Sequence, residues 1–271
     1  KSGDTYFEDD QGQPWRCLHY VPNSVCYQQV ERPEQFYQSA LSFGHFLKQL
    51  GDYPAESLYE TIPKFHDTVK RFRDFEDAQR KDVKNRARLC RPEIEFVLSR
   101  QEDCGVLMKQ LEEGILPLRV THNDTKLNNI LFDADTDKGL CIIDLDTIMP
   151  GLAANDFGDS IRFGASTAEE DEPDLDKVHF DISLYDIYVK GYLEMAKDVL
   201  TPAEIESLPW GARLMTLECG MRFLADFLQG DVYFKTAYPE HNLVRARTQF
   251  RLVKEMEEQF DEMKNILKKY V

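Results

Sequence analysis

Apolar residues recur at helical spacing over most of the chain, and Pro and Gly mark where several helices should begin and end. Between Pro33 and Gly51, apolar residues stand three or four positions apart, which is typical of a helix with one buried face. Pro in a first turn and Gly after a last turn suit the two ends of such a helix. The inward residues of this expected helix are Phe36, Ala40, Phe43, Leu47 and Leu50.

The same spacing predicts three shorter helical segments before residue 115. The first is rich in charge, the second begins near Pro92, and the third covers 106–111 and ends at Gly114. The mixed charges of residues 71–91 are interpreted as a solvated face rather than a nucleic-acid surface. The inward residues are expected to be Val69, Phe72, Phe75 and Ala78 in the first helix, and Ile94, Val97 and Leu98 in the second.

From about residue 180 the chain is expected to be helical, with helices near 180–199, 210–228 and 241–267. Thr201 is an N-cap candidate, because Pro202 suits the first helical position and Glu204 completes a capping box.

Strand patterns occur near the start and in the middle of the chain. Ile130–Phe132 and Leu140–Leu145 are two apolar runs joined by a polar turn, which predicts a hairpin. Asp10–Pro14 indicates another hairpin connection, followed by an expected strand at Trp15–Val21. Together with the helices, these strands indicate an α+β fold that is mainly helical.

Composition and charge narrow the function classes. The 271 residues are 42% hydrophobic and 30% charged, which is ordinary for a globular protein, and the formal net charge is −16. So acidic a chain argues against a nucleic-acid partner, which needs Lys and Arg for the phosphates. No apolar run is long enough to span a membrane. The six cysteines (Cys17, Cys26, Cys90, Cys104, Cys141 and Cys219) form no CxxC pair, so reduced thiols and a cytoplasmic location are expected.

Candidate chemistry is concentrated in residues 120–146. Phosphoryl transfer requires a carboxylate to orient the acceptor hydroxyl and receive its proton, together with oxygen ligands for Mg²⁺. Asp124 can supply the first group, and Asn129 with Asp144 can supply the metal ligands. Lys126 can reach the migrating phosphate, because its compact ammonium acts as a point charge. The spacing is that of a kinase catalytic loop followed by a metal-binding Asp.

This stretch has two alternative interpretations. An isolated His-x-Asp is common in surface turns, whereas the joint pattern with Lys, Asn and a strand-end Asp is far rarer by chance. A calcium loop of the EF-hand type would place its ligands at positions 1, 3, 5 and 12. However, Lys138 stands where that loop needs Gly, and the flanks read as strands. Four acidic residues occupy those positions: Asp133, Asp135, Asp137 and Asp144.

The stretch resembles the small-molecule kinases of the aminoglycoside phosphotransferase and choline kinase superfamily. Asn123 replaces the Arg of protein kinases, and Leu145-Asp146 replaces their Phe-Gly, so the pattern points away from protein kinases. Within the superfamily, HNDTKLNNILFD, IDLDTIMPG, NDFGDSIR and RFLADFLQGDVYFK look like the N-acetylhexosamine 1-kinases. The similarity runs from about Trp15 to the C-terminus.

This resemblance implies ATP- and Mg²⁺-dependent phosphorylation of the anomeric hydroxyl of N-acetylglucosamine or N-acetylgalactosamine. It also implies sugar contacts for Arg222, Tyr233 and His122. Because Arg222 lies between apolar neighbours, its burial beside an acidic partner is expected, and a structural ion pair is the alternative to its sugar contact. The alternatives are another small-molecule kinase acting on an aminoglycoside, choline, ethanolamine or a different sugar, and a non-catalytic binding fragment. The expected partners are therefore a sugar acceptor and ATP, with no nucleic acid and no membrane.

The resemblance further implies a protein-kinase-like fold with two lobes. Residues 1–25 would be a remnant of the ATP-binding N-lobe sheet and its hinge, and residues 26–271 would form the C-lobe. No glycine-rich phosphate loop or strand lysine occurs near the start, so the chain is expected to lack most of the N-lobe. The nucleotide-binding residues consequently stay unassigned.

Three further features are expected to be structural. Asp156 should be stabilised by the free amides at a helix start, and its family counterpart helps to order the catalytic loop. His66 is interpreted as a capping or core residue rather than a substrate contact. The acidic segment 168–176 is expected to be a mobile surface loop.

Overall fold

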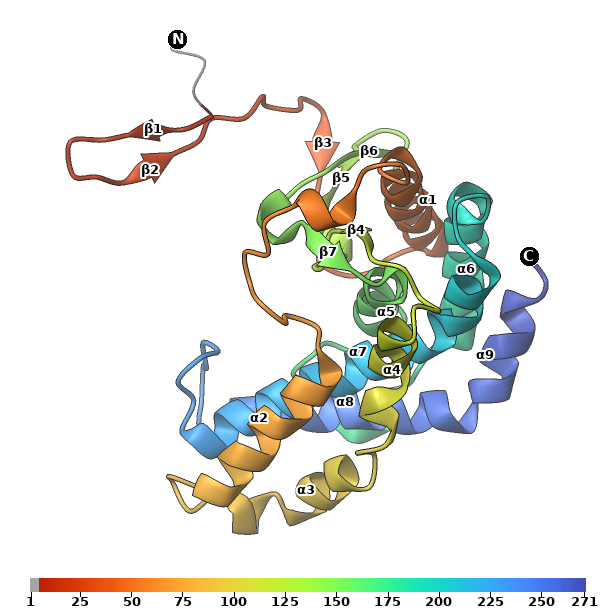
Figure 1. Cartoon of the computed structure of the whole chain (residues 1–271). Coiled ribbons are helices and arrows are strands. Elements are labelled where there is room, and N and C mark those ends of the chain that lie inside the picture. Colours follow the sequence, from red (N-terminus) through yellow and green to blue (C-terminus); the bar gives the residue numbers. More distant parts are fainter. Residues whose placement is uncertain (1–4) are drawn as a thin grey trace.

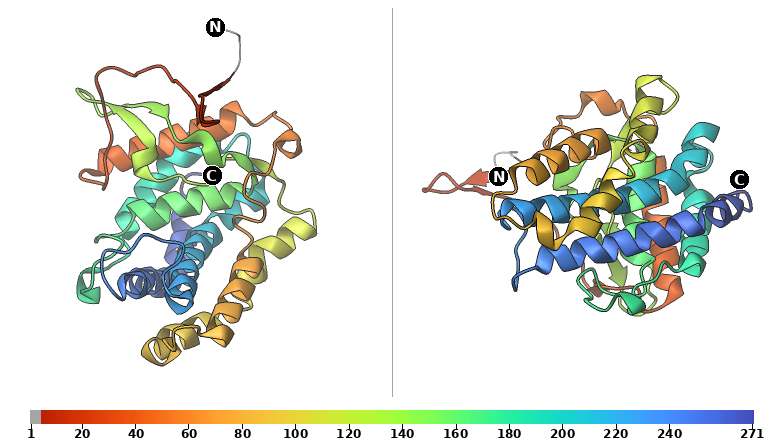
Figure 2. Two further views of the ribbon diagram at one scale, coloured as in Figure 1. Left: turned by 90° about the vertical axis from the view of Figure 1, so that its left-hand side faces the viewer. Right: turned by 90° about the horizontal axis from the view of Figure 1, so that it is seen from below.

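The helices of this protein pack around one long helix, α7 (Pro202–Gln229), which crosses the molecule (Figure 1). The computed structural model describes residues 5–271. Helices α5 (Ala153–Gly164), α8 (His241–Glu258) and α2 (Thr68–Lys81) all pack against α7. The view from below in Figure 2 shows α8 running beside α7. Among the helices formed by residues 5–271, none is long and apolar enough to cross a membrane.

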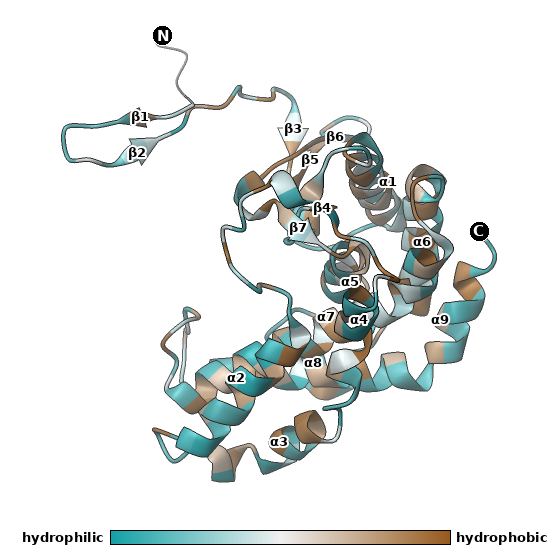
Figure 3. Cartoon of the chain, viewed as in Figure 1, coloured by the Kyte–Doolittle hydropathy of each residue, from teal (hydrophilic) through white to brown (hydrophobic). Residues whose placement is uncertain are grey.

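A second group of helices surrounds this centre. α1 (Pro33–Gln49) packs against α6 (Ile182–Ala196), and α9 (Phe260–Leu267) contacts α6 and α7. Two short helices, α3 (Arg91–Leu98) and α4 (Val106–Glu112), also lie against α7. The side of α2 that faces the viewer in Figure 3 is largely hydrophilic, while Phe72, Phe75 and Ala78 are buried.

Small antiparallel sheets carry the segments around residues 120–150. β4 (Arg119–Thr121) pairs with β7 (Met149–Gly151), and β5 (Ile130–Asp133) pairs with β3 (Ser24–Val25) and β6 (Gly139–Ile142). The polar loop that follows β4 therefore lies between two sheets. β1 (Phe7–Glu8) and β2 (Pro14–Trp15) form a separate hairpin, which stands apart from the helices in Figure 1.

Two glycines allow α5 and α7 to cross at close range. A Cβ atom built at Gly211 would lie 1.9 Å from the carbonyl oxygen of Ala154, and one built at Gly158 would lie 2.2 Å from the carbonyl oxygen of Gly211. Any larger side chain would therefore separate the helices. This crossing sets the position of Asp156 on α5 relative to the residues of α7 that follow Gly211.

Several predictions from the sequence are confirmed. The helix expected between Pro33 and Gly51 is α1, and the hairpin at Asp10–Pro14 joins β1 to β2. The capping box is present, because the Thr201 side chain accepts a hydrogen bond from the Glu204 backbone, and the Glu204 carboxylate accepts one from the Thr201 backbone.

Other predicted boundaries are wrong. The helix expected from about residue 210 is the second part of α7, which continues through Pro209 because the helices packed around it hold it together. The long helix expected at 241–267 is divided at Gln259 into α8 and α9. The change of direction lets α9 bury Met263, Ile266 and Leu267.

Three local predictions also need correction. The strand expected at Trp15–Val21 is limited to Pro14–Trp15, because no further strand pairs with the exposed residues after it. The second strand of the central hairpin ends at Ile142, so it does not reach Leu145. Leu98, expected to point inward, is exposed at the last turn of α3.

Candidate active site

Asp124 lies in the loop between β4 and β5, and two neighbours of the same loop hold its carboxylate. Its Oδ2 atom accepts a hydrogen bond of 2.8 Å from Asn129 Nδ2, and its Oδ1 atom lies 3.0 Å from Lys126 Nζ. The side chain is 28% exposed, so it is accessible from outside. The loop thus presents a carboxylate whose orientation is fixed by residues two and five positions further on.

Asp156 anchors this loop from α5. Its two carboxylate oxygens accept hydrogen bonds from the backbone N–H groups of His122 (2.7 Å) and Asn123 (2.8 Å). The prediction that Asp156 helps to order the catalytic loop agrees with this geometry. It uses amides of the loop, however, rather than the free amides of its own helix. Burial raises the pKa of Asp156, and the His122 side chain and the two backbone N–H groups oppose that rise.

Asn123 has an unusual backbone conformation directly before Asp124. Its φ is +63°, in the left-handed region that Asn tolerates better than most residues. Its side-chain amide donates to the backbone carbonyls of Thr121 (3.2 Å) and Thr147 (2.9 Å), and its Oδ1 accepts from the Thr121 hydroxyl (3.0 Å). These contacts explain why an Asn suits the position that is Arg in protein kinases.

Asp144 follows β6 and lies next to the loop. Its backbone is left-handed, with φ of 59°, and its side chain is exposed. The preceding residue, Ile143, donates its backbone N–H to the carbonyl of Asn129 at 2.9 Å. The backbone therefore brings the chain segments of Asp144 and Asn129 together.

These two residues fit a magnesium site by the chemistry of their donors. Asn129 uses its Nδ2 group to hold Asp124, so its Oδ1 atom is free for another contact. Mg²⁺ prefers hard oxygen ligands and is usually held by one or two carboxylates together with substrate phosphates. Residues 5–271 contain no cluster of three or more His, Cys, Asp or Glu side chains suited to a metal.

A cleft of about 560 Å³ brings the loop together with α7. Asp124, Lys126, Arg222 and Tyr233 all line it, although Arg222 is 98 positions from Asp124 in the sequence. The structure thus places the candidate base and two of the predicted sugar contacts around one space.

Aromatic rings surround the Arg222 guanidinium. Its Cζ atom lies 5.3 Å from the ring centre of Phe65, 5.8 Å from that of Tyr233 and 5.5 Å from that of Phe234. Among residues 5–271, no carboxylate lies within 4.0 Å of it, so the expected acidic partner is a wrong prediction. Arg222 is half-buried, and Tyr233 is 70% exposed. Arginine stacks on aromatic faces in this manner while its N–H donors stay available.

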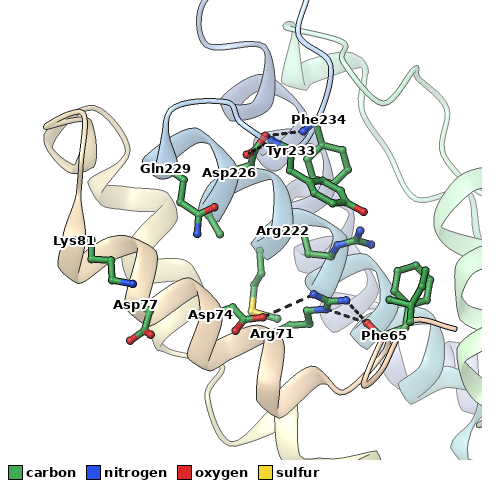
Figure 4. A pocket seen from close by; sticks show the side chains of 13 residues that line it. Phe65, Arg71, Asp74, Asp77, Lys81, Arg222, Asp226, Gln229, Tyr233 and Phe234 are labelled. Atoms are coloured by element: carbon green, nitrogen blue, oxygen red, sulfur yellow. Dashed lines mark hydrogen bonds and ion pairs between the residues drawn. The ribbon is translucent and has the colours of Figure 1, made fainter. Parts of the chain in front are cut away.

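A neighbouring hollow of about 380 Å³ lies between α2 and α7 and shares Arg222, Tyr233 and Phe234 with the cleft (Figure 4). Asp74 and Asp77 of α2 line its far side. Both carboxylates are paired within α2, Asp74 with Lys70 and Asp77 with Arg80.

His122 lies in the core rather than in the cleft. Its ring is fully buried near Phe43 and Phe46, and its Nε2 atom lies 3.0 Å from the carbonyl oxygen of Ile143. A carbonyl oxygen only accepts, so Nε2 carries the proton. This position gives no support to the predicted substrate contact. His122 instead joins the loop to the segment that carries Asp144.

Several cleft residues were not found from the sequence. Asp159 and Arg162 of α5 form a buried pair, with Arg162 Nε 2.9 Å from Asp159 Oδ1. Burial alone would raise the pKa of Asp159, but Arg162, Lys126 and His66 together outweigh it and lower that pKa. Glu218 also lines the cleft, and its place one helical turn before Arg222 is a signal that could have identified it.

Residues of the acidic segment 168–176 bond to several parts of the protein body. Glu170 lies 2.8 Å from Arg162, and Asp171 lies 2.9 Å from His241 on α8. The sequence predicted a mobile surface loop, whereas Glu170 and Asp171 are half-buried and paired. Asp137 of the central hairpin is likewise engaged, with Arg32 and Tyr27.

Comparison with known proteins shows the family of this chain. The model of the phosphotransferase enzyme family (APH) matches residues 6–194, so the chain belongs to that family. Choline kinase from Cryptosporidium parvum Iowa II is similar in structure, with a TM-score of 0.57 and 14% identity over 93% of this chain and 73% of that chain.

Two further structures are similar at low sequence identity. A Plasmodium vivax ethanolamine kinase gives a TM-score of 0.54 and 16% identity over 85% of this chain and 64% of its own. A microcompartment-associated aminopropanol kinase gives 0.52 and 16% over 96% of this chain and 76% of its own. These similarities confirm the predicted protein-kinase-like α+β fold.

Proposed function

We propose that this protein transfers the terminal phosphoryl group of ATP to the anomeric hydroxyl of an N-acetylhexosamine. The observation that carries the proposal is the shared cleft, in which Asp124 faces the same space as an Arg222 guanidinium that no carboxylate within residues 5–271 neutralises. Membership of a phosphotransferase family supports the class of reaction, and the residues that line the cleft support a sugar as the acceptor.

Asp124 would orient the acceptor hydroxyl and receive its proton, because its carboxylate is fixed by Asn129 and accessible. Asn129 and Asp144 would hold Mg²⁺, which neutralises the charge of the phosphates. Lys126 would contact the migrating phosphoryl group after turning away from Asp124, to which it is 3.0 Å distant. In phosphoryl transfer, such positioning and charge neutralisation supply most of the catalysis.

The surroundings of Arg222 favour an uncharged acceptor rich in hydroxyl groups. Three ring faces would attract a cationic ligand, but the guanidinium already occupies that place and adds a positive charge. An amine or quaternary ammonium would therefore be repelled near Arg222, whereas sugar oxygens can accept its hydrogen bonds. Tyr233 offers an exposed ring against which a sugar ring can lie.

The second candidate is phosphorylation of an amino-alcohol, and Asp74 with Asp77 favours it. Their carboxylates line the hollow beside the cleft and could attract an ammonium group. Each is already paired with a cation of α2, so this attraction is weakened. For that reason we rank the amino-alcohol below the sugar.

Two further assignments belong to this proposal. Residues up to about 25, which include the β1–β2 hairpin, would belong to the ATP-binding lobe, and residues 26–271 to the acceptor lobe. All six cysteines are free thiols, which supports a cytoplasmic location.

The proposal is tested with the intact enzyme, ATP and a panel of acceptors: N-acetylglucosamine, N-acetylgalactosamine, choline, ethanolamine and kanamycin. Phosphorus NMR of the product should show a sugar 1-phosphate. Asp124→Asn should lower turnover roughly 10²- to 10⁴-fold without unfolding the protein. Preferential phosphorylation of choline, ethanolamine or kanamycin would refute the sugar assignment, and full activity of Asp124→Asn would refute the mechanism.

A further inference from the structure

His66 connects helix α7 to the catalytic loop at the residue directly before Asp124. Its Nδ1 atom lies 2.9 Å from Glu218 Oε1 on α7, and its Nε2 atom lies 3.2 Å from the backbone carbonyl oxygen of Asn123. The side chain of His66 is 8% exposed and that of Glu218 is 1% exposed. Water therefore has little access to either contact.

Both contacts can be satisfied at once only if the pair holds an additional proton. The Asn123 carbonyl can only accept, so Nε2 must carry a proton to bond it. An ionised Glu218 also only accepts, so Nδ1 must carry a second proton. A neutral imidazole has one N–H, and it would leave one ring lone pair facing an oxygen in a buried site.

The charges around the pair place that proton on His66. Arg71 Nε of α2 lies 4.0 Å from Glu218 Oε1 and favours the ionised carboxylate. Asp159 and Asp156 of α5 face His66 and favour the imidazolium. Although burial lowers the pKa of His66, Glu218, Asp159 and the Asn123 carbonyl more than offset it, and the net pKa is raised. The remaining charged groups that line the same cleft are Asp124, Lys126, Arg162, Glu170, Arg222, Lys235 and Arg245.

We infer that His66 is a positioning residue of the reaction, whose proton, held against Glu218, fixes the Asn123 peptide and thereby the direction of Asp124. Both backbone groups of Asn123 are hydrogen-bonded, because Asp156 accepts from its N–H at 2.8 Å and His66 donates to its carbonyl oxygen. The backbone of Asn123 is left-handed. Loss of either contact would let its peptide groups rotate and would change the direction of the Asp124 side chain. Glu218 also lies one turn before Arg222 on α7. The His66–Glu218 pair therefore connects the helix that carries the proposed sugar contact to the candidate base Asp124.

This inference rests on the proposed function for its kinetic consequences. As pH rises through the raised pKa of His66, one of its two contacts is lost and Asp124 becomes less well positioned. We expect kcat to fall on this alkaline side. His66→Gln, which cannot bridge both oxygens, should lower kcat roughly 10- to 100-fold, remove the alkaline dependence and change the KM for ATP little.

The chain provides a matched control in His179. Its ring makes the same two kinds of contact, with Glu255 Oε1 at 3.0 Å and the Asp176 carbonyl at 2.9 Å, but it does not line the cleft. His179→Gln should therefore keep the wild-type kcat and pH profile. Glu218→Gln keeps an acceptor for Nδ1 but removes the charge that favours the imidazolium, so its alkaline limb should move to lower pH.

Nitrogen-15 NMR of the His66 ring in the wild-type enzyme tests the inference without a variant. Both ring nitrogens should be protonated at pH 7, and one should lose its proton as kcat falls. A single protonated nitrogen at pH 7 overturns the inference, even if His66→Gln fails to fold. A wild-type kcat and pH profile for folded His66→Gln also overturns it. Neither readout depends on which acceptor is phosphorylated, so a failed sugar assignment is distinguished from a failed role for His66.

Discussion

The Asp156 carboxylate on α5 accepts a 2.8 Å hydrogen bond from the backbone N–H of Asn123, the residue that precedes the candidate base. Because its other oxygen binds the N–H of His122, both oxygens of Asp156 are used to hold consecutive peptide groups. The position of Asp124 is therefore set by a helix that lies outside the loop. α5 is itself held against α7 by the close contact of Gly158 and Gly211.

Asp156→Asn should lower kcat while leaving the KM for ATP close to its wild-type value. An amide has one oxygen, so one of the two N–H groups would lose its acceptor and face an NH₂ group in a buried site. A misplacement of the loop of this kind costs up to roughly 100-fold in turnover. Steady-state kinetics with ATP and the best acceptor measure both parameters. An unchanged kcat in a folded Asp156→Asn variant would contradict the anchoring role.

The same residue predicts a pH dependence of stability. Burial raises the pKa of Asp156 to about 6, above its value in the unfolded chain. The stabilisation that arises from this raised pKa is therefore complete at pH values below about 3.9, the pKa of Asp in the unfolded chain. It is lost as the pH rises through about 6. The free energy of unfolding of the wild type, minus that of Asp156→Asn, should fall between pH 4 and pH 7. Urea titrations over this range measure it, and a difference independent of pH would argue against the raised pKa.

Gly211→Ala should destabilise the protein by at least about 1–3 kcal/mol, because overpacking forces α5 and α7 apart. The added Cβ atom would lie 1.9 Å from the Ala154 carbonyl oxygen. Gly105→Ala is the matched control, since nothing lies within 4 Å of a Cβ atom there, and its effect should stay within about 1 kcal/mol. Denaturant unfolding of both variants gives the comparison, and equal stabilities would show that the helices do not meet at Gly211.

Asp144→Asn should raise the Mg²⁺ concentration needed for half-maximal activity by roughly tenfold or more, since loss of a supporting group alone costs 10- to 100-fold in metal affinity. Its fold should be unaffected, because the side chain is exposed. Asp135→Asn is the matched control, as an exposed Asp of the central hairpin that the calcium-loop interpretation would use as a ligand. Mg²⁺ titrations of activity measure both effects, and an equal or stronger effect of Asp135→Asn would place the metal in the hairpin loop instead.

The predictions from sequence succeeded where the signal was local. α1 has Pro in its first turn and a continuous apolar face, and both features lie within 20 residues. The candidate catalytic residues stand at fixed short spacings, so their common loop could be expected, and the hairpin beside it is defined by two apolar runs. Such patterns contain their own structural information, so the elements could be expected without any tertiary contact.

The predictions failed where distant segments decide the outcome. α7 continues through Pro209 because its neighbours hold it, although the local sequence suggests an interruption there. The surroundings of Arg222 depend on Phe65, which comes from the segment before α2. His66 and Glu218 are 152 positions apart, and no spacing rule brings them together. Contacts between such distant segments can be identified only from the three-dimensional structure. The structure shows, for example, that Arg222 lies against aromatic rings rather than beside the expected carboxylate.

Arg222→Lys should raise the KM for the sugar acceptor roughly 10- to 100-fold, the worth of a hydrogen bond to a charged group. A planar guanidinium donates in two directions while stacked on rings, and a lysine ammonium cannot reproduce this geometry. The KM for ATP should change little, because Arg222 lies among Phe65, Tyr233 and Phe234, on the side of the cleft that we propose binds the acceptor. Arg91→Lys, at an exposed site paired with Glu95, controls for the substitution itself. Equal rises in both KM values, or none for the acceptor, would remove Arg222 from the acceptor site.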